Sequence, residues 1–174
     1  GIYTDKSGAL WLSTKGDGVI VIPDYESYKG TAADRSRVHR YMKNEGLGSN
    51  EAYAFCPSTD GSLLWIGTSG KKLSYYSYQT RKFGTVDADL AGVAVHNILS
   101  VGENSLLVAS DTEGLVRIDY SMKNSVPHID GKTVFKFKHK NIDCNNFYAM
   151  VQDSDSTLLI GLKTGYGLVR FNIN

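Results

Sequence analysis

The sequence predicts an all-β protein, because one pattern of short strands recurs four times along its 174 residues. In each repeat an apolar anchor strand follows a turn of small or acidic residues and leads to a second apolar strand. The equivalent anchor positions Trp11, Trp65, Leu107 and Leu159 are spaced 54, 42 and 52 residues apart. Tandem units of about 40–50 residues that each hold several strands are typical of β-propeller blades. We therefore expect a partial β-propeller of about four blades.

Within each blade we expect up to four antiparallel strands, A to D from the propeller axis outward. The A strands are expected at 2–5, 51–57, 95–101 and 147–152, and the anchors form the B strands at 10–14, 64–68, 106–110 and 158–162. The C strands are expected at 18–22, 72–76, 114–118 and 167–173, and the D strands at 37–42, 82–85 and 133–139. Residues 1–174 then form a single unit with blades at about 2–50, 51–94, 95–146 and 147–174, the last of which lacks a D strand.

The anchor strands are almost continuously apolar, which indicates that both of their faces are covered. Stacked blades cover their middle strands in this way, so we assign Trp11 and Trp65 to packing between blades. Gly67 and Gly161 are expected to permit close approach of the neighbouring sheet, although each could instead mark a bulge. The long C–D connections at 23–36 and 121–132 are polar and contain prolines, so we expect surface loops there.

Composition and charge exclude several classes of function. The formal net charge of +1 gives no overall attraction to nucleic acid, and no apolar stretch is long enough to cross a bilayer. Cys56 and Cys144 lack metal-site spacing, and we expect both to be buried free thiols. The segment 135–140 alternates Phe and Lys, which on a D strand directs the lysines outward rather than forming a nucleic-acid patch.

The chain opens within a repeat and without Met, so we expect it to be a piece of a longer protein. Three complete blades and part of a fourth leave two blade faces uncovered. Exposed apolar surface of this kind is rare on a monomer. We therefore expect other blades of a parent propeller, or self-association, to cover these faces.

Residues 60–68 (DGSLLWIGT) resemble the signature of the two-component regulator propeller repeats, and residues 5–14 match it equally well. The continuation fits at 114–120 and 167–171, and residues 44–50 resemble the connection between repeats of that family. The resemblance implies the periplasmic sensor region of a hybrid two-component histidine kinase/response regulator from bacteria that degrade polysaccharides. It implies a non-catalytic sensor segment, because the parts of the kinase are absent from this sequence.

Enzymatic and metal chemistry find little support in the residues. No two of the four histidines (His39, His96, His128 and His139) stand at ligand spacing, and no nucleophile motif or phosphate-binding loop is present. Residues 153–156 alternate side-chain oxygens, but the rest of a calcium loop is missing, so a solvated turn is favoured. We expect no catalytic residues, no metal, no cofactor, no nucleic acid partner and no membrane contact.

A ligand surface is the remaining candidate, because the D–A and B–C loops of a propeller share one face around the central channel. Charged, amide and aromatic residues on these loops suit a polar ligand such as an oligosaccharide. Exposure to solvent alone would also make these loops polar. The alternative function is a protein–protein interaction propeller without a small ligand. The candidates are Lys15, Asp17, Lys71, Lys72, Asp111, Glu113, Lys163 and Tyr166 from the B–C loops, and Tyr53, His96, Asn146 and Tyr148 from the D–A side.

Overall fold

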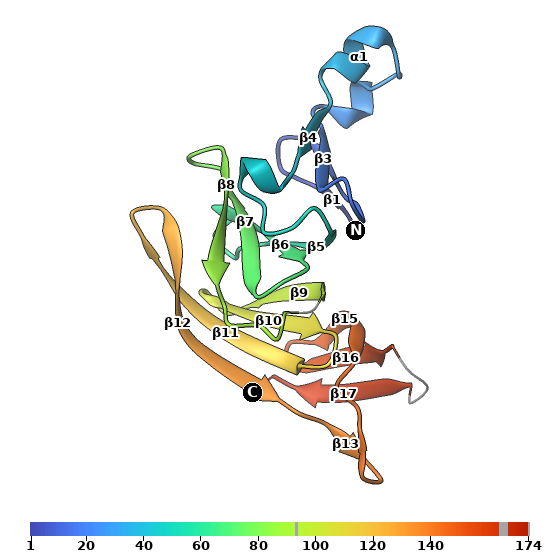
Figure 1. The fold of residues 1–174 in the computed structure, drawn as a ribbon, viewed down its shortest axis with the longest axis vertical. Helices are drawn as coiled ribbons and strands as arrows, with labels where there is room; N and C mark the ends of the chain where they lie inside the picture. Colours follow the sequence, from blue (N-terminus) through green and yellow to red (C-terminus); the bar gives the residue numbers. More distant parts are fainter. Residues whose placement is uncertain (93, 164–166, 174) are drawn as a thin grey trace.

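The computed structural model describes residues 1–92, 94–163 and 167–173 and shows an all-β chain with little helix. Its antiparallel sheets follow one another in chain order (Figure 1), and strands of successive sheets are in contact. The predicted partial propeller is confirmed.

Each blade is a meander in which consecutive strands pair. The first contains β1 (Ile2–Thr4), β2 (Leu10–Ser13), β3 (Val19–Ile22) and β4 (His39–Tyr41), and the second contains β5 (Ala52–Pro57), β6 (Leu63–Thr68), β7 (Lys72–Ser77) and β8 (Lys82–Asp87). The third contains β9 (Val95–Val101), β10 (Ser105–Ser110), β11 (Gly114–Lys123) and β12 (Val126–Phe135). The fourth has three strands, β15 (Phe147–Ser154), β16 (Thr157–Leu162) and β17 (Leu168–Asn172).

The connection after β3 is not the plain loop that the sequence predicts. It contains a 3-10 turn, η1 (Tyr25–Ser27), and a short helix, α1 (Ala32–Ser36), which project from the first blade (Figure 1). Thr31 and Asp34 form a reciprocal capping box at the start of α1, because each side chain accepts the backbone N–H of the other. A second 3-10 turn, η2 (Lys43–Glu45), follows β4.

The predicted loop at 121–132 is wrong, because these residues extend β11 and β12 into a long hairpin. Asn124 and Ser125 form its tip with φ values of 51° and 64°, a conformation that suits a tight hairpin turn. The predicted D strand at 133–139 is correspondingly displaced and ends at Phe135. A separate two-stranded hairpin follows, formed by β13 (Lys138–His139) and β14 (Ile142–Asp143). Phe137 is half-buried and the lysines on either side of it are exposed. The predicted alternation of inward Phe and outward Lys therefore holds here, although these residues do not form a D strand.

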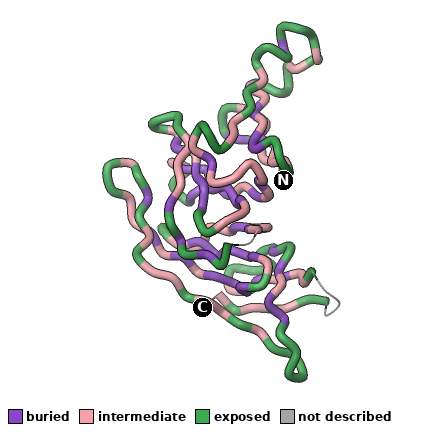
Figure 2. The backbone as a smooth tube through the Cα atoms, in the orientation of Figure 1, coloured by how far each residue is buried: buried purple, intermediate pink, exposed green. Residues whose placement is uncertain are grey.

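The core consists of apolar clusters between consecutive blades, and the middle strands are the most buried part of the chain (Figure 2). Trp11 packs with residues of β6, Trp65 with residues of β10 and β11, and Leu107 with residues of β16. Both indoles are buried, at 3% and 0% exposure. The prediction that these anchors lie between blades is confirmed, and each faces the blade that follows it.

The glycine prediction holds for Gly67, where a Cβ atom would lie 2.4 Å from the carbonyl oxygen of Val95 in the next blade. Gly161 differs, because its nearest neighbours are Ala149 atoms of its own blade at 3.8 Å. The difference arises because no described residue covers the outer face of the fourth blade. Cys56 and Cys144 are both buried and free, as the sequence predicts.

Candidate functional site

The innermost strands of three consecutive blades each carry a β-bulge at their second residue. In β5 the ladder passes from Ala52 directly to Ala54, and the corresponding shifts in β9 and β15 fall at equivalent positions. The residues at the three bulges are Tyr53, His96 and Tyr148. A bulge redirects a side chain away from the regular alternation of the strand, and here it does so at one position in each repeat.

The three bulge residues form a row of rings along the inner side of the blades. The ring centroids of Tyr53 and His96 are 5.1 Å apart at an interplanar angle of 69°. The centroids of His96 and Tyr148 are 4.7 Å apart at 40°. Tyr148 is 57% exposed, so one end of this row is open to a ligand.

The B–C loops contribute a second set of repeated positions, four residues after each anchor: Lys15, Ser69, Asp111 and Lys163. The Lys163 Nζ atom donates to Asp111 Oδ2 over 2.9 Å, and His96 Nε2 lies 3.3 Å from the same oxygen. Burial alone would raise the pKa of Asp111, but the Lys163 and His96 contacts outweigh burial and lower it. The same hydrogen bond raises the pKa of Lys163, so the pair is charged at neutral pH.

Tyr53 is held in place by its own blade. Its hydroxyl donates to Glu51 Oε2 over 3.0 Å, and Ser69 Oγ donates to the same oxygen over 2.7 Å. These hydrogen bonds lower the pKa of Glu51. Tyr53 therefore presents a fixed ring face, which reduces the ordering cost of stacking a ligand on it.

The three bulge residues, with Lys15, Asp111 and Lys163, line a cavity of about 640 Å³, which we call the axial pocket. The volume lies within the range of small-molecule sites. Its aromatic rings supply apolar surface, and its two lysines and one carboxylate supply charged hydrogen-bond donors and acceptors. The lining residues are Gly1, Ser13, Lys15, Ala52, Tyr53, Ala94, His96, Asp111, Tyr148 and Lys163.

The axial pocket brings together six residues that the sequence marked as candidates: Lys15, Tyr53, His96, Asp111, Tyr148 and Lys163. Lys71 and Lys72 instead line a neighbouring cavity of about 480 Å³. Asn146 lies by a third cavity, where its Oδ1 accepts the N–H of Thr112 over 2.8 Å.

Two further candidates have structural contacts elsewhere. Asp17 is exposed and pairs with Arg40 at 3.1 Å. Glu113 is buried, where it pairs with Lys132 at 2.7 Å and accepts the N–H of Ala91. Tyr166 lies outside the described residues.

Two polar residues of this region were not predicted: Ser13, which lines the axial pocket, and Ser69, which hydrogen-bonds Glu51 beside Tyr53. Ser69 occupies the same repeat position as Lys15, Asp111 and Lys163, so the spacing from the anchors would have identified it. Among residues 1–92, 94–163 and 167–173, no group of three or more His, Cys, Asp or Glu side chains is placed to hold a metal ion. In the same residues, no helix has the length and apolar character needed to cross a membrane.

The strand pattern around β6 agrees with a known family. Residues 46–70 match the two component regulator propeller. The matched segment contains the D–A connection, β5 and β6. It therefore includes Tyr53 of the axial pocket and Ser69, which donates a hydrogen bond to Glu51 beside it. The match includes residues 60–68, so the resemblance inferred from them is confirmed. The sequence matches no curated protein.

Solved structures show the same fold at low sequence identity. The extracellular domain of a proposed one component system from B. thetaiotaomicron has a TM-score of 0.70 at 17% identity, covering 99% of this chain and 22% of that chain. The extracellular domain of a proposed hybrid two component system from the same organism has a TM-score of 0.59 at 16% identity, covering 99% and 27%. The β-propeller domain of Cps50 (Swd1) from Myceliophteria thermophila has a TM-score of 0.64 at 16% identity, covering 98% and 50%. The chain therefore spans half or less of each of these proteins.

Proposed function

We propose that this chain is a non-catalytic propeller segment of an extracytoplasmic sensor in a hybrid two-component receptor, and that its axial pocket binds an oligosaccharide. The match of residues 46–70 to the two component regulator propeller supports the receptor class. The fold shared with extracellular domains of signalling proteins is consistent with a periplasmic location.

The convergence of Tyr53, His96 and Tyr148 on one pocket carries the ligand proposal. Stacked aromatic faces suit the C–H faces of sugar rings, and the charged groups of Asp111 and Lys163 suit hydroxyl groups. Because these side chains come from different blades, a ligand that touches them all would favour one arrangement of the blades. Its effect on signalling is limited by its difference in affinity between the two receptor states.

Calorimetric titration of the parent ectodomain with a panel of oligosaccharides tests this proposal. We expect saturable heat with one class of glycan. Tyr148→Ala removes the most exposed ring of the pocket and is expected to weaken that binding by about fivefold, since stacked aromatic contacts contribute on the order of 1 kcal/mol. Tyr25→Ala is the matched control, because Tyr25 is an exposed tyrosine outside the pocket at 38% exposure. No heat with any glycan, or equal losses in the two variants, would contradict the proposal.

A protein–protein interaction propeller is the second candidate, and the exposed apolar faces of the end blades favour it. Ile2 on the first blade is 77% exposed, and Val151 and Leu168 on the fourth are 60% and 61% exposed. Leu159 lies opposite Val151 on the same outer face. We propose that other blades of a parent propeller, or a second copy of this chain, cover these faces. Silence with all glycans together with recovery of a tight protein partner would favour this second candidate.

A further inference from the structure

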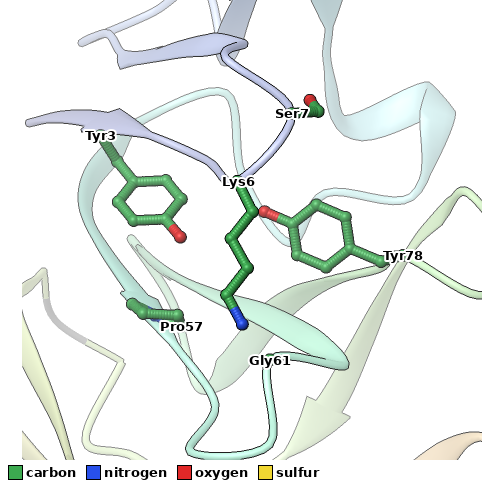
Figure 3. Close-up of a pocket in the computed structure, with 6 residues that line it drawn as sticks. All are labelled: Tyr3, Lys6, Ser7, Pro57, Gly61 and Tyr78. Atoms are coloured by element: carbon green, nitrogen blue, oxygen red, sulfur yellow. The ribbon is translucent and has the colours of Figure 1, made fainter.

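A second cavity lies between the first two blades, at the opposite end of the strands from the axial pocket. Its volume is about 340 Å³, at the lower end of the range for small-molecule sites. The lining residues are Tyr3, Lys6, Ser7, Pro57, Gly61 and Tyr78 (Figure 3). We call this cavity the inter-blade pocket.

The walls of the inter-blade pocket are mainly apolar rings. Tyr3 comes from β1, Pro57 ends β5, and Tyr78 follows β7. Figure 3 shows the hydroxyl groups of Tyr3 and Tyr78 directed toward each other, with the Lys6 side chain extending from its turn between the two rings. Tyr78 is held from behind by Trp11, with centroids 6.4 Å apart at 72°, and by Tyr76, with centroids 5.3 Å apart at 90°. The Tyr78 wall of the pocket is therefore fixed by the core.

The Lys6 ammonium has no ion pair or hydrogen bond with any described residue. It lies over Gly61, at 3.0 Å from the position that a Cβ atom would take there. The two carboxylates of the adjoining turns are occupied elsewhere. Asp5 accepts hydrogen bonds from Ser7 and Trp11, and Asp60 accepts them from the turn of the second blade. The pocket thus holds one cation without a neutralising partner.

At the equivalent junction, hydrogen bonds join the second blade to the third. Ser58 occupies the turn position equivalent to Asp5, so Thr59 is the equivalent of Lys6. Thr59 Oγ1 donates to the carbonyl oxygen of Gly102 over 2.6 Å. Ser100 Oγ donates to the carbonyl oxygen of Pro57 over 2.7 Å. Between the turns of the first and second blades, no such hydrogen bond joins the described residues. The first junction therefore lacks the hydrogen bonds that tie the second blade to the third.

We propose that the inter-blade pocket binds a small aromatic carboxylate. Its ring would lie against Tyr3, Pro57 and Tyr78, since aromatic rings pack favourably in edge or offset geometry. Its carboxylate would pair with the Lys6 ammonium in a charge-assisted hydrogen bond. A sugar is less suited to this lining, because the Ser7 hydroxyl is engaged by Asp5 and the remaining polar groups are the Tyr3 and Tyr78 hydroxyls and one ammonium in a mainly aromatic wall. Binding here would be independent of any oligosaccharide in the axial pocket.

NMR titration of the 174-residue chain with benzoate, and with benzyl alcohol as the uncharged analogue, tests this proposal. We expect benzoate to produce saturable shifts at the backbone amides of Lys6 and Gly61, with tighter binding than benzyl alcohol. Lys6→Met keeps the aliphatic stem and removes the charge. It is expected to weaken benzoate binding about fivefold and to leave benzyl alcohol unchanged, as for loss of one partly exposed charge pair.

Lys140→Met is the matched control, because Lys140 is an exposed lysine in the β13–β14 hairpin, which lies beside the fourth blade and away from the first two (Figure 1). It is expected to leave both affinities unchanged. Equal binding of benzoate and benzyl alcohol, equal losses in the two lysine variants, or absence of saturable shifts at Lys6 and Gly61 would overturn the proposal. Shifts confined to His96 and Lys163 would place the probe in the axial pocket and would overturn it as well.

Discussion

Trp65→Ala tests whether the anchor strands hold consecutive blades together. The Trp65 indole is fully buried between the second and third blades, with edge contacts to Tyr75 at a centroid distance of 6.0 Å and to Tyr120 at 5.0 Å. Replacing a buried Trp by Ala removes its transfer free energy and leaves a cavity, which together cost about 3–5 kcal/mol. Because a domain of this kind is stable by about 5–15 kcal/mol, the variant should lose a large part of its free energy of unfolding.

Leu159→Ala is the matched comparison, because Leu159 occupies the same repeat position in the fourth blade. A buried Leu→Ala change costs about 2–5 kcal/mol, but the Leu159 side chain lies on an outer face that no described residue covers. We therefore expect a loss of about 1 kcal/mol in the free energy of unfolding. Urea unfolding followed by far-UV circular dichroism measures both changes without relying on the tryptophans. Equal losses in the two variants, or a loss below about 1 kcal/mol for Trp65→Ala, would refute the account of blade packing.

Two further predictions concern the turns and the glycines. Burial alone would raise the pKa of Asp5, but hydrogen bonds from Ser7 and Trp11 outweigh burial and lower it. The stability that Asp5 contributes is therefore complete above its unfolded pKa of about 3.9 and is lost as pH falls through the lower folded pKa. Below pH 4, the free energy of unfolding measured with urea should therefore change less with pH in Asp5→Asn than in the unaltered chain. An equal change with pH in the two proteins would contradict this. Gly67→Ala should lower the free energy of unfolding by about 1–3 kcal/mol, since its Cβ would lie 2.4 Å from the next blade. Gly161→Ala should change it by less than about 0.5 kcal/mol in the same assay, because the nearest atom would lie 3.8 Å from the added Cβ. Equal effects of the two glycine changes would show that close approach of blades is not the reason for Gly67.

The sequence predicts the inner three strands of each blade well, because their apolar runs report burial on both faces. It predicts the C–D connections poorly. Residues 121–132 are polar yet mostly form strand, because β12 is an edge strand in which only Pro127 is buried, so its other side chains need not be apolar. Residues 23–38 are also polar, and the helix there depends on a local capping box between Thr31 and Asp34 rather than on an apolar face. Polarity alone does not separate these two outcomes from a loop.

The candidate site was predictable to the extent that it follows the repeat. Tyr53, His96 and Tyr148 occupy one position, and the sequence places all of them on the D–A side without revealing that each stands at a bulge. Asp17 and Glu113 come from the same B–C loops as residues of the pocket, but they form ion pairs with Arg40 and Lys132 of outer strands. Loop membership therefore identifies the face, whereas the exact position within the repeat identifies the pocket.

This distinction explains how the fold accommodates varied chemistry at one place. Positions that pack between blades, such as Trp65, are constrained by volume, and Gly67 is constrained by the approach of the next backbone. The bulge residue has neither constraint, because it is displaced from the ladder and directed toward the axis. Tyrosine and histidine both occupy it in this chain, next to a loop position that holds lysine, serine or aspartate. A propeller built on this plan could therefore change its ligand by substitution at two positions per blade without disturbing the packing that holds the blades together.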